Sequence, residues 1–175
     1  MNRTSWSVAN FLAFLALLLI TTAAQTSLLH WVFGWRPTIQ MGVVILTYVS
    51  LYRNPTEGLL FVVLACYCTA LQSIMLVSLN IFTGICVFLL IQALRTRVYS
   101  HSPVYFTWTA LGAVLAFHII AWTTSLIFEP RTPSPRPLDW ILEVLITALF
   151  TRLLFHFFCW IDRKTKRLSL TELNS

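Results

Sequence analysis

The feature that most constrains the fold of this chain is a run of 37 residues without a charged side chain, between Glu57 and Arg95. As a single α-helix this run would be about 55 Å long, nearly twice the roughly 30 Å hydrocarbon core of a bilayer. It is long enough for two short membrane-spanning helices. Four polar residues mark the expected turn between them: Gln72, Ser73, Ser78 and Asn80.

The composition of the whole chain indicates the same class of protein. Of its 175 residues, 58% are hydrophobic and 10% are charged, and the mean hydropathy is +0.77. Soluble domains contain about 25% charged residues, so a soluble globular fold is excluded. At roughly 20 residues per span, no room remains for a separate soluble domain. We therefore predict a single all-α membrane domain.

Charged residues and prolines divide the chain into six apolar blocks. Breaks are expected at Arg53-Asn54-Pro55 and in the proline-rich segment 131–137, because proline cannot continue a helix. The predicted spans are residues 7–29, 38–52, 58–75, 79–95, 103–128 and 138–161, followed by a basic tail over residues 162–175.

Six spans place both termini on the same side of the membrane. If that side is the cytoplasm, it holds eight basic residues: Arg3, Arg53, Arg95, Arg97, Arg163, Lys164, Lys166 and Arg167. The other side holds three: Arg36, Arg131 and Arg136. Basic residues concentrate on the cytoplasmic side of membrane proteins, so the sequence predicts an N-in/C-in orientation. The same rule accounts for the formal net charge of +6 without nucleic acid as a partner.

The sequence carries no pattern typical of an enzyme or of a metal site. It contains no glycine-rich phosphate loop, no His-Glu-x-x-His helix and no Gly-x-Ser-x-Gly turn. The four cysteines lie in apolar runs, which favours free thiols over disulfides. Cys66 and Cys68 lie about 200° apart around a helix and cannot share a metal. We predict a protein without catalytic activity, cofactor or metal.

Glu143 and Arg152 are charged residues inside the last apolar block, where each costs roughly 2.5–3.5 kcal/mol on insertion scales. Glu143 either faces the outer headgroup layer or contacts another helix or a partner protein. His118, near the middle of the fifth span, is expected to approach it through an interhelical hydrogen bond. Arg152 is out of phase with Glu143 but shares a face with His156 and Arg163. It either snorkels to the inner leaflet or belongs to a basic stripe that docks a partner.

Further polar residues have simpler roles. Gln72 and Asn80 are predicted to form hydrogen bonds between helices. Arg95, Arg97, Arg163 and Lys164 are expected to form a basic inner surface. That surface would bind either a cytoplasmic partner or anionic lipids.

The order of the residue motifs resembles a known family. The motifs are Arg36-Pro37, Tyr48-x-x-Leu51-Tyr52-Arg53, Glu57-Gly58, Leu94-Arg95-Thr96-Arg97, Leu138-Asp139-Trp140 and Trp160-Ile161-Asp162-Arg163-Lys164. From about residue 36 onward the chain resembles the bacterial rod shape-determining protein MreD family. It departs from the family pattern at Gln72, where an Asp is usual, and at Ser78-Leu79-Asn80, which replaces a Pro-Leu-Gly-like turn. The resemblance is therefore to a divergent member.

The resemblance implies a non-catalytic scaffold of the cell-elongation complex in the bacterial inner membrane. Its implied partners are an MreC-like bitopic protein, a RodA-type glycosyltransferase, a class B penicillin-binding protein and, directly or indirectly, the MreB filament. The implied fold resembles the substrate-binding subunits of energy-coupling-factor transporters. Such a vitamin transporter subunit is the alternative function. It would need an outer pocket, for which the candidate residues are Gln40, His118, Trp122 and Glu143.

Overall fold

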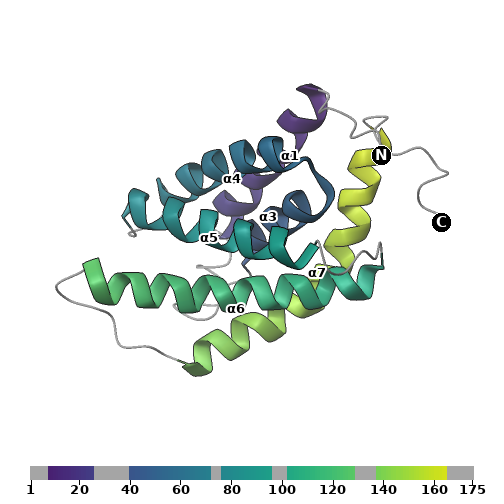
Figure 1. The fold of residues 1–175 in the computed structure, drawn as a ribbon. Helices are drawn as coiled ribbons and strands as arrows, with labels where there is room; N and C mark the ends of the chain where they lie inside the picture. Colours follow the sequence, from purple (N-terminus) through teal and green to yellow (C-terminus); the bar gives the residue numbers. More distant parts are fainter. Residues whose placement is uncertain (1–7, 26–39, 72–75, 96–101, 129–136, 165–175) are drawn as a thin grey trace.

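The computed structural model describes residues 8–25, 40–71, 76–95, 102–128 and 137–164, and every element within these ranges is a helix (Figure 1). The helices are α1 (Val8–Ala24), α3 (Met41–Tyr52), α4 (Pro55–Ala70), α5 (Val77–Arg95), α6 (Pro103–Phe128) and α7 (Pro137–Lys164). The predictions made for Gln72 and Arg97 lie outside the described residues.

The helix boundaries follow local chemistry. The predicted break after α3 is present, because Arg53 and Asn54 adopt extended backbone conformations. Helix α4 begins at Pro55, three residues earlier than predicted, since proline fits the first turn of a helix, where its missing N–H needs no partner. Helix α6 has the predicted bounds.

Helix α7 corrects the predicted start of the basic tail. It continues through Lys164, so the first three residues assigned to the tail, 162–164, are helical. Asp162 lies on the buried face of this last turn, with only 2% of its surface exposed. The charge of Asp162 therefore belongs to the interior of the protein.

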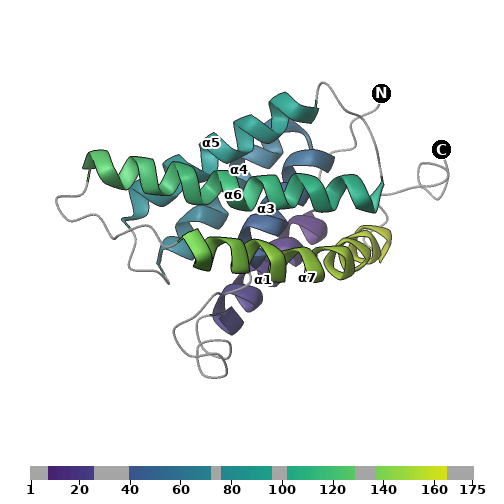
Figure 2. The same ribbon diagram turned by 90° about the horizontal axis from the view of Figure 1, so that it is seen from below.

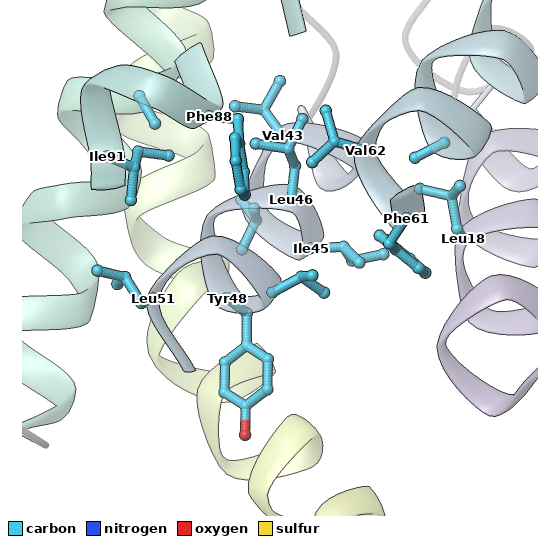
Figure 3. Close-up of a cluster of buried hydrophobic side chains, with 14 of the residues drawn as sticks. Leu18, Val43, Ile45, Leu46, Tyr48, Leu51, Phe61, Val62, Phe88 and Ile91 are labelled. Carbon is cyan, nitrogen blue, oxygen red and sulfur yellow. The ribbon is translucent and has the colours of Figure 1, made fainter. Parts of the chain in front are cut away.

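Helix α3 is the centre of the fold. It contacts each of the five other helices, and its nine consecutive residues 43–51 are all buried. Figure 3 shows its side chains pointing toward several neighbouring helices at once, among them Ile45, Leu46 and Tyr48. The buried hydroxyls of Thr47 and Ser50 donate to the carbonyls four residues earlier, Val43 and Leu46. A helix of only 12 residues is thus enclosed by protein on all sides.

The outer helices are longer and keep apolar faces exposed. Helices α5, α6 and α7 are long and apolar enough to cross a membrane, whereas α1, α3 and α4 are apolar but shorter. Helices α6 and α7 lie side by side and run in opposite directions (Figures 1 and 2). Leu149 on α7 and Ile127 on α6 are 78% and 74% exposed. Exposed apolar surface on this scale is what a bilayer accommodates and water does not.

Candidate functional site

The described polar side chains gather at two ends of the bundle. The amino end of α1 and the carboxyl ends of α3, α5 and α7 meet around Asp162, and we call this the Asp162 end. The amino ends of α3 and α7 meet α6 around Glu143, and we call this the Glu143 end. This arrangement requires each described helix of the α3–α7 series to run opposite to the one before it.

At the Asp162 end, one buried carboxylate joins three helices. Its Oδ1 accepts a hydrogen bond from Asn10 Nδ2 on α1, at 2.8 Å, and forms an ion pair with Arg53 Nη2 directly after α3. Its Oδ2 accepts a hydrogen bond from the Tyr48 hydroxyl, at 2.7 Å. The exposed fractions of Arg53 and Asp162 are 3% and 2%. Both carboxylate oxygens therefore have donors, and the two charges compensate each other away from solvent.

Aromatic rings enclose this polar cluster. Tyr48 stacks on Phe14, with ring centroids 5.6 Å apart, and lies 4.9 Å from the ring of Phe158. The guanidinium of Arg53 lies 5.2 Å from the centroid of the Phe14 ring, which is a cation–π contact. In Figure 3 the Tyr48 side chain points away from the aliphatic core toward α7. The rings exclude water and so strengthen the electrostatic interactions inside.

Helix α5 completes the same end by capping α3. The last carbonyls of a helix have no partner within it. Here Gln92 Nε2 donates to the Ser50 carbonyl at 2.8 Å, and Arg95 Nη1 donates to the Arg53 carbonyl at 2.7 Å. Arg95, which the sequence placed on a partner-binding surface, is thus engaged within the chain and is half-buried. Its guanidinium closes the end of the central helix.

At the Glu143 end, a half-buried carboxylate is shared by three helices. His118 Nε2 on α6 lies 2.8 Å from Glu143 Oε2, and both side chains are 15% exposed. Gln40 Nε2, at the start of α3, donates to the same oxygen at 3.1 Å. The predicted approach of His118 to Glu143 is confirmed as a close contact, but not as a hydrogen bond, since His118 Nε2 has no hydrogen-bond partner among the described residues. Of the alternatives open for Glu143, the structure shows the contact with other helices.

Two tryptophans cover the Glu143 cluster. The ring of Trp140 stacks on His118, with centroids 5.5 Å apart and an interplanar angle of 10°. Trp122 meets Trp140 edge to face at 6.4 Å. The indole N–H of Trp122 is buried and has no hydrogen-bond acceptor within the part of the chain that the structure describes. The four residues considered for an outer pocket thus gather at one place.

Asn80 has the interhelical role predicted for it. Its Nδ2 donates to the Cys66 carbonyl at 2.8 Å and to Thr69 Oγ1 at 2.9 Å, and so joins α5 to α4. One turn on, a Cβ at Gly84 would overlap Cys66 Sγ. The glycine therefore permits the close approach of these two helices. All four cysteines are free, as expected.

The remaining candidate residues lie on the outward face of α7. Arg152, His156, Arg163 and Lys164 are all exposed. His156 Nδ1 lies 2.8 Å from the carbonyl oxygen of Arg152, one turn earlier. Lys164 Nζ lies 4.6 Å from the centroid of the Trp160 ring. The guanidiniums of Arg152 and Arg163 have no acidic partner in residues 8–25, 40–71, 76–95, 102–128 and 137–164.

The described side chains do not assemble a metal site, since no three His, Cys, Asp or Glu residues among them are grouped to hold an ion. Comparison of the chain with protein-family models, with curated proteins and with solved structures gave no match. A function for the chain therefore rests on its residues and their arrangement.

The Arg53–Asp162 pair is the feature that sequence reasoning missed. Arg53 was counted as one basic residue of an inner loop and Asp162 as part of a tail. Helical phase gives the missing signal, because Thr147, Thr151, Phe155, Phe158 and Asp162 recur every three to four residues. All five are buried, so Asp162 continues the inward stripe of α7.

Proposed function

We propose that this chain is a non-catalytic scaffold of the bacterial cell-elongation complex and a divergent member of the MreD family. It acts in the inner membrane as a six-span protein with both termini in the cytoplasm. Its partners are an MreC-like bitopic protein, a RodA-type glycosyltransferase and a class B penicillin-binding protein, with the MreB filament bound directly or indirectly. The family fold, which resembles substrate-binding subunits of energy-coupling-factor transporters, is part of this proposal.

The observation that carries the proposal is the meeting of two motifs. Tyr48-x-x-Leu51-Tyr52-Arg53 and Trp160-Ile161-Asp162-Arg163-Lys164 are motifs of the resemblance, and they are 109 residues apart at their Arg53–Asp162 contact. In the structure they form one buried cluster, in which the charges of Arg53 and Asp162 compensate each other and both carboxylate oxygens of Asp162 accept hydrogen bonds. The cluster fixes the positions of α1, α3 and α7 relative to one another, which is the requirement of a scaffold.

The distribution of charge supports the proposed orientation. Arg53, Arg95, Arg163 and Lys164 all lie at the Asp162 end, which the proposal places in the cytoplasm. Membrane-impermeant thiol labelling of cysteines introduced at Ser134 and Ser169, in a chain without native cysteines, tests this orientation. We expect labelling of intact cells at Ser134 only, and labelling at Ser169 after permeabilisation. The opposite pattern would overturn the orientation.

The function is tested by mass spectrometry of the proteins that co-purify from native membranes in mild detergent. We expect a single-span protein with a periplasmic coiled coil, together with cell-wall synthases. Depletion of the chain is expected to turn rod-shaped cells into spheres. Recovery of paired ATPases with a membrane coupling subunit, and cells of unchanged shape, would refute the scaffold.

The alternative, a vitamin-binding subunit of a transporter, is favoured by one observation. Gln40, His118 and Glu143 converge at the Glu143 end, beside Trp122 and Trp140. Native mass spectrometry of the purified protein tests it, because a vitamin subunit is expected to retain a small molecule. Loss of that molecule in Glu143→Leu, with retention in Asp139→Leu, would favour the transporter over the scaffold.

A further inference from the structure

The outward face of α7 carries a stripe of exposed residues that mixes polar and apolar side chains. Six exposed residues make up this stripe: Leu149, Arg152, Leu153, His156, Trp160 and Arg163. At 100° per residue they fall within about 100° of the helix circumference, opposite the buried stripe that ends at Asp162. Helix α7 contacts α1, α3 and α6 through its other faces.

The depth of Arg152 makes its exposure unusual. Helix α7 has 28 residues and is about 42 Å long, so its ends extend beyond a hydrocarbon core of roughly 30 Å. With the helix centred, Arg152 lies about 2 Å from the midplane and about 13 Å from the nearer boundary. Trp160 then lies at that boundary, and Lys164, in contact with the Trp160 ring, lies among the headgroups. An interfacial tryptophan is the usual anchor there, which supports this placement.

Headgroups are a poor partner for a guanidinium at that depth. A snorkelling Arg152 would have to extend along more than two turns of its own helix. Side chains of a helix also lean toward its amino end, and for Arg152 this direction leads away from the nearer boundary. His156 lies one turn closer to that boundary, and its Nδ1 lies 2.8 Å from the Arg152 carbonyl oxygen. A counter-charge beside the helix is the more effective neutraliser.

The described acidic residues of a second copy of the chain do not supply that charge. The chain has six acidic residues: Glu57, Glu129, Asp139, Glu143, Asp162 and Glu172. Glu57 and Asp162 lie at the Asp162 end, and Asp139 and Glu143 lie in the first two turns of α7, at the other end. Glu129 and Glu172 are not among the described residues. None of the four described acidic residues lies at the level of Arg152.

We infer that this stripe docks a membrane-spanning helix of another protein, which carries an Asp or Glu at mid-bilayer depth. The carboxylate binds the Arg152 guanidinium, and the leucines around it pack against the apolar residues of the incoming helix. The inference rests on the proposed function only in that the chain has a membrane-protein partner. The charge and depth of Arg152 specify the chemistry of that partner.

Site-specific photo-crosslinking in cells tests this inference. A photoreactive amino acid at Leu149 or Leu153 samples the stripe, and one at Leu60, an exposed residue of α4, is the control. We expect a discrete adduct at the stripe positions whose mapped peptide comes from a membrane span with an acidic residue. Arg152→Leu is expected to reduce the adduct at least tenfold, whereas Arg152→Lys keeps it within twofold. Equal membrane levels of the variants exclude a folding defect as the cause.

A charge exchange decides between a helix and lipid. Arg152→Glu is expected to abolish the adduct, and a lysine in place of the partner's carboxylate is expected to restore it. Adducts with lipid only, a partner span without an acidic residue, or an adduct indifferent to Arg152→Leu would each overturn the inference. If cell-wall synthases still co-purify with the Arg152→Leu variant, the proposed scaffold function stands, but its contacts with the synthases lie on another face of the protein. If the crosslinked acidic span belongs to a transporter subunit, the inference that the stripe binds a helix stands, and the proposed scaffold function is refuted.

Discussion

Replacement of Asp162 by leucine is expected to be among the most destabilising single changes in the chain. The substitution preserves the side-chain volume approximately, but it removes the acceptor of three donors from three places in the fold. Arg53, 3% exposed, would lose the Asp162 carboxylate as its counter-ion, and the Asn10 amide and Tyr48 hydroxyl would each lose a hydrogen bond. Loss of one member of a buried ion pair costs about 3–5 kcal/mol.

A double-mutant cycle separates the ion pair from packing. Arg53→Met alone leaves the Asp162 carboxylate buried without its cation and is expected to cost about 3–5 kcal/mol as well. In the combined variant with Asp162→Leu neither charge of the pair remains. We expect it to be no less stable than Asp162→Leu alone. The sum of the two single effects would then exceed the double effect by at least about 3 kcal/mol, a coupling typical of residues in contact or in one hydrogen-bond network.

The measurement is the unfolding of the full chain in mild detergent by increasing sodium dodecyl sulfate, followed by tryptophan fluorescence. Asp139→Leu is the matched control, because Asp139 lies on the same helix and has no ion pair within the described ranges. Its expected cost is below about 1 kcal/mol, the size of a helix-dipole effect. Additive single effects, or a cost for Asp162→Leu no larger than for Asp139→Leu, would refute the assignment of a buried ion pair.

Three other sites give predictions that thermal unfolding in detergent can check. Gly84→Ala is expected to lower the free energy of unfolding by about 1–3 kcal/mol, because the new Cβ would overlap Cys66 Sγ. Adding Cys66→Ala to the same chain is expected to recover most of that loss. Gly112→Ala is the control, because a Cβ at this position meets nothing within 4 Å, and it is expected to raise the free energy of unfolding by about 0.5–1 kcal/mol. Equal effects at the two glycines would contradict the close approach of α4 and α5. Asn80→Leu removes two donated hydrogen bonds and is expected to cost about 0.6–1.7 kcal/mol, whereas no loss would mean that α4 and α5 associate through packing alone. Glu143→Leu is expected to be less stable than Glu143→Gln, because glutamine still offers an oxygen to its neighbours at the Glu143 end, and the reverse order would show that the cluster is not held by hydrogen bonds.

The sequence predicts the elements whose signals are local. Proline and the adjacent charges fix the break at Arg53-Asn54-Pro55, and an uninterrupted apolar run gives α6 with its observed bounds. The contact of His118 with Glu143 also follows from local reasoning, because a charged group in an apolar span requires a partner from another helix. These inferences depend on the cost of exposing a group to hydrocarbon.

The role of Asp162 requires tertiary information. A charge count assigns Arg53 and Asp162 to the membrane boundary, where each is an ordinary residue of a loop or a tail. Their pairing depends on the short, enclosed α3, which brings Tyr48 and Arg53 to the inner face of α7. The helical phase of α7 shows that Asp162 faces inward, but it does not show which cation forms an ion pair with it. The sequence alone therefore yields the burial of this residue and not its partner.

Two classes of charged residue follow from this structure, and they bear differently on function. Asp162, Arg53, Glu143 and Arg95 interact with other groups of the chain, so their chemistry is directed at holding the helices together. Arg152 is the opposite case, since its guanidinium lies on an apolar face without a counter-charge in the described residues. At the depth that we infer for it, a free energy that favours this exposed cation has to come from a group other than the described residues. If a partner helix supplies that free energy, the binding of the partner and the stability of the chain in the membrane depend on the same contact. Selection for a scaffold function would then retain Arg152.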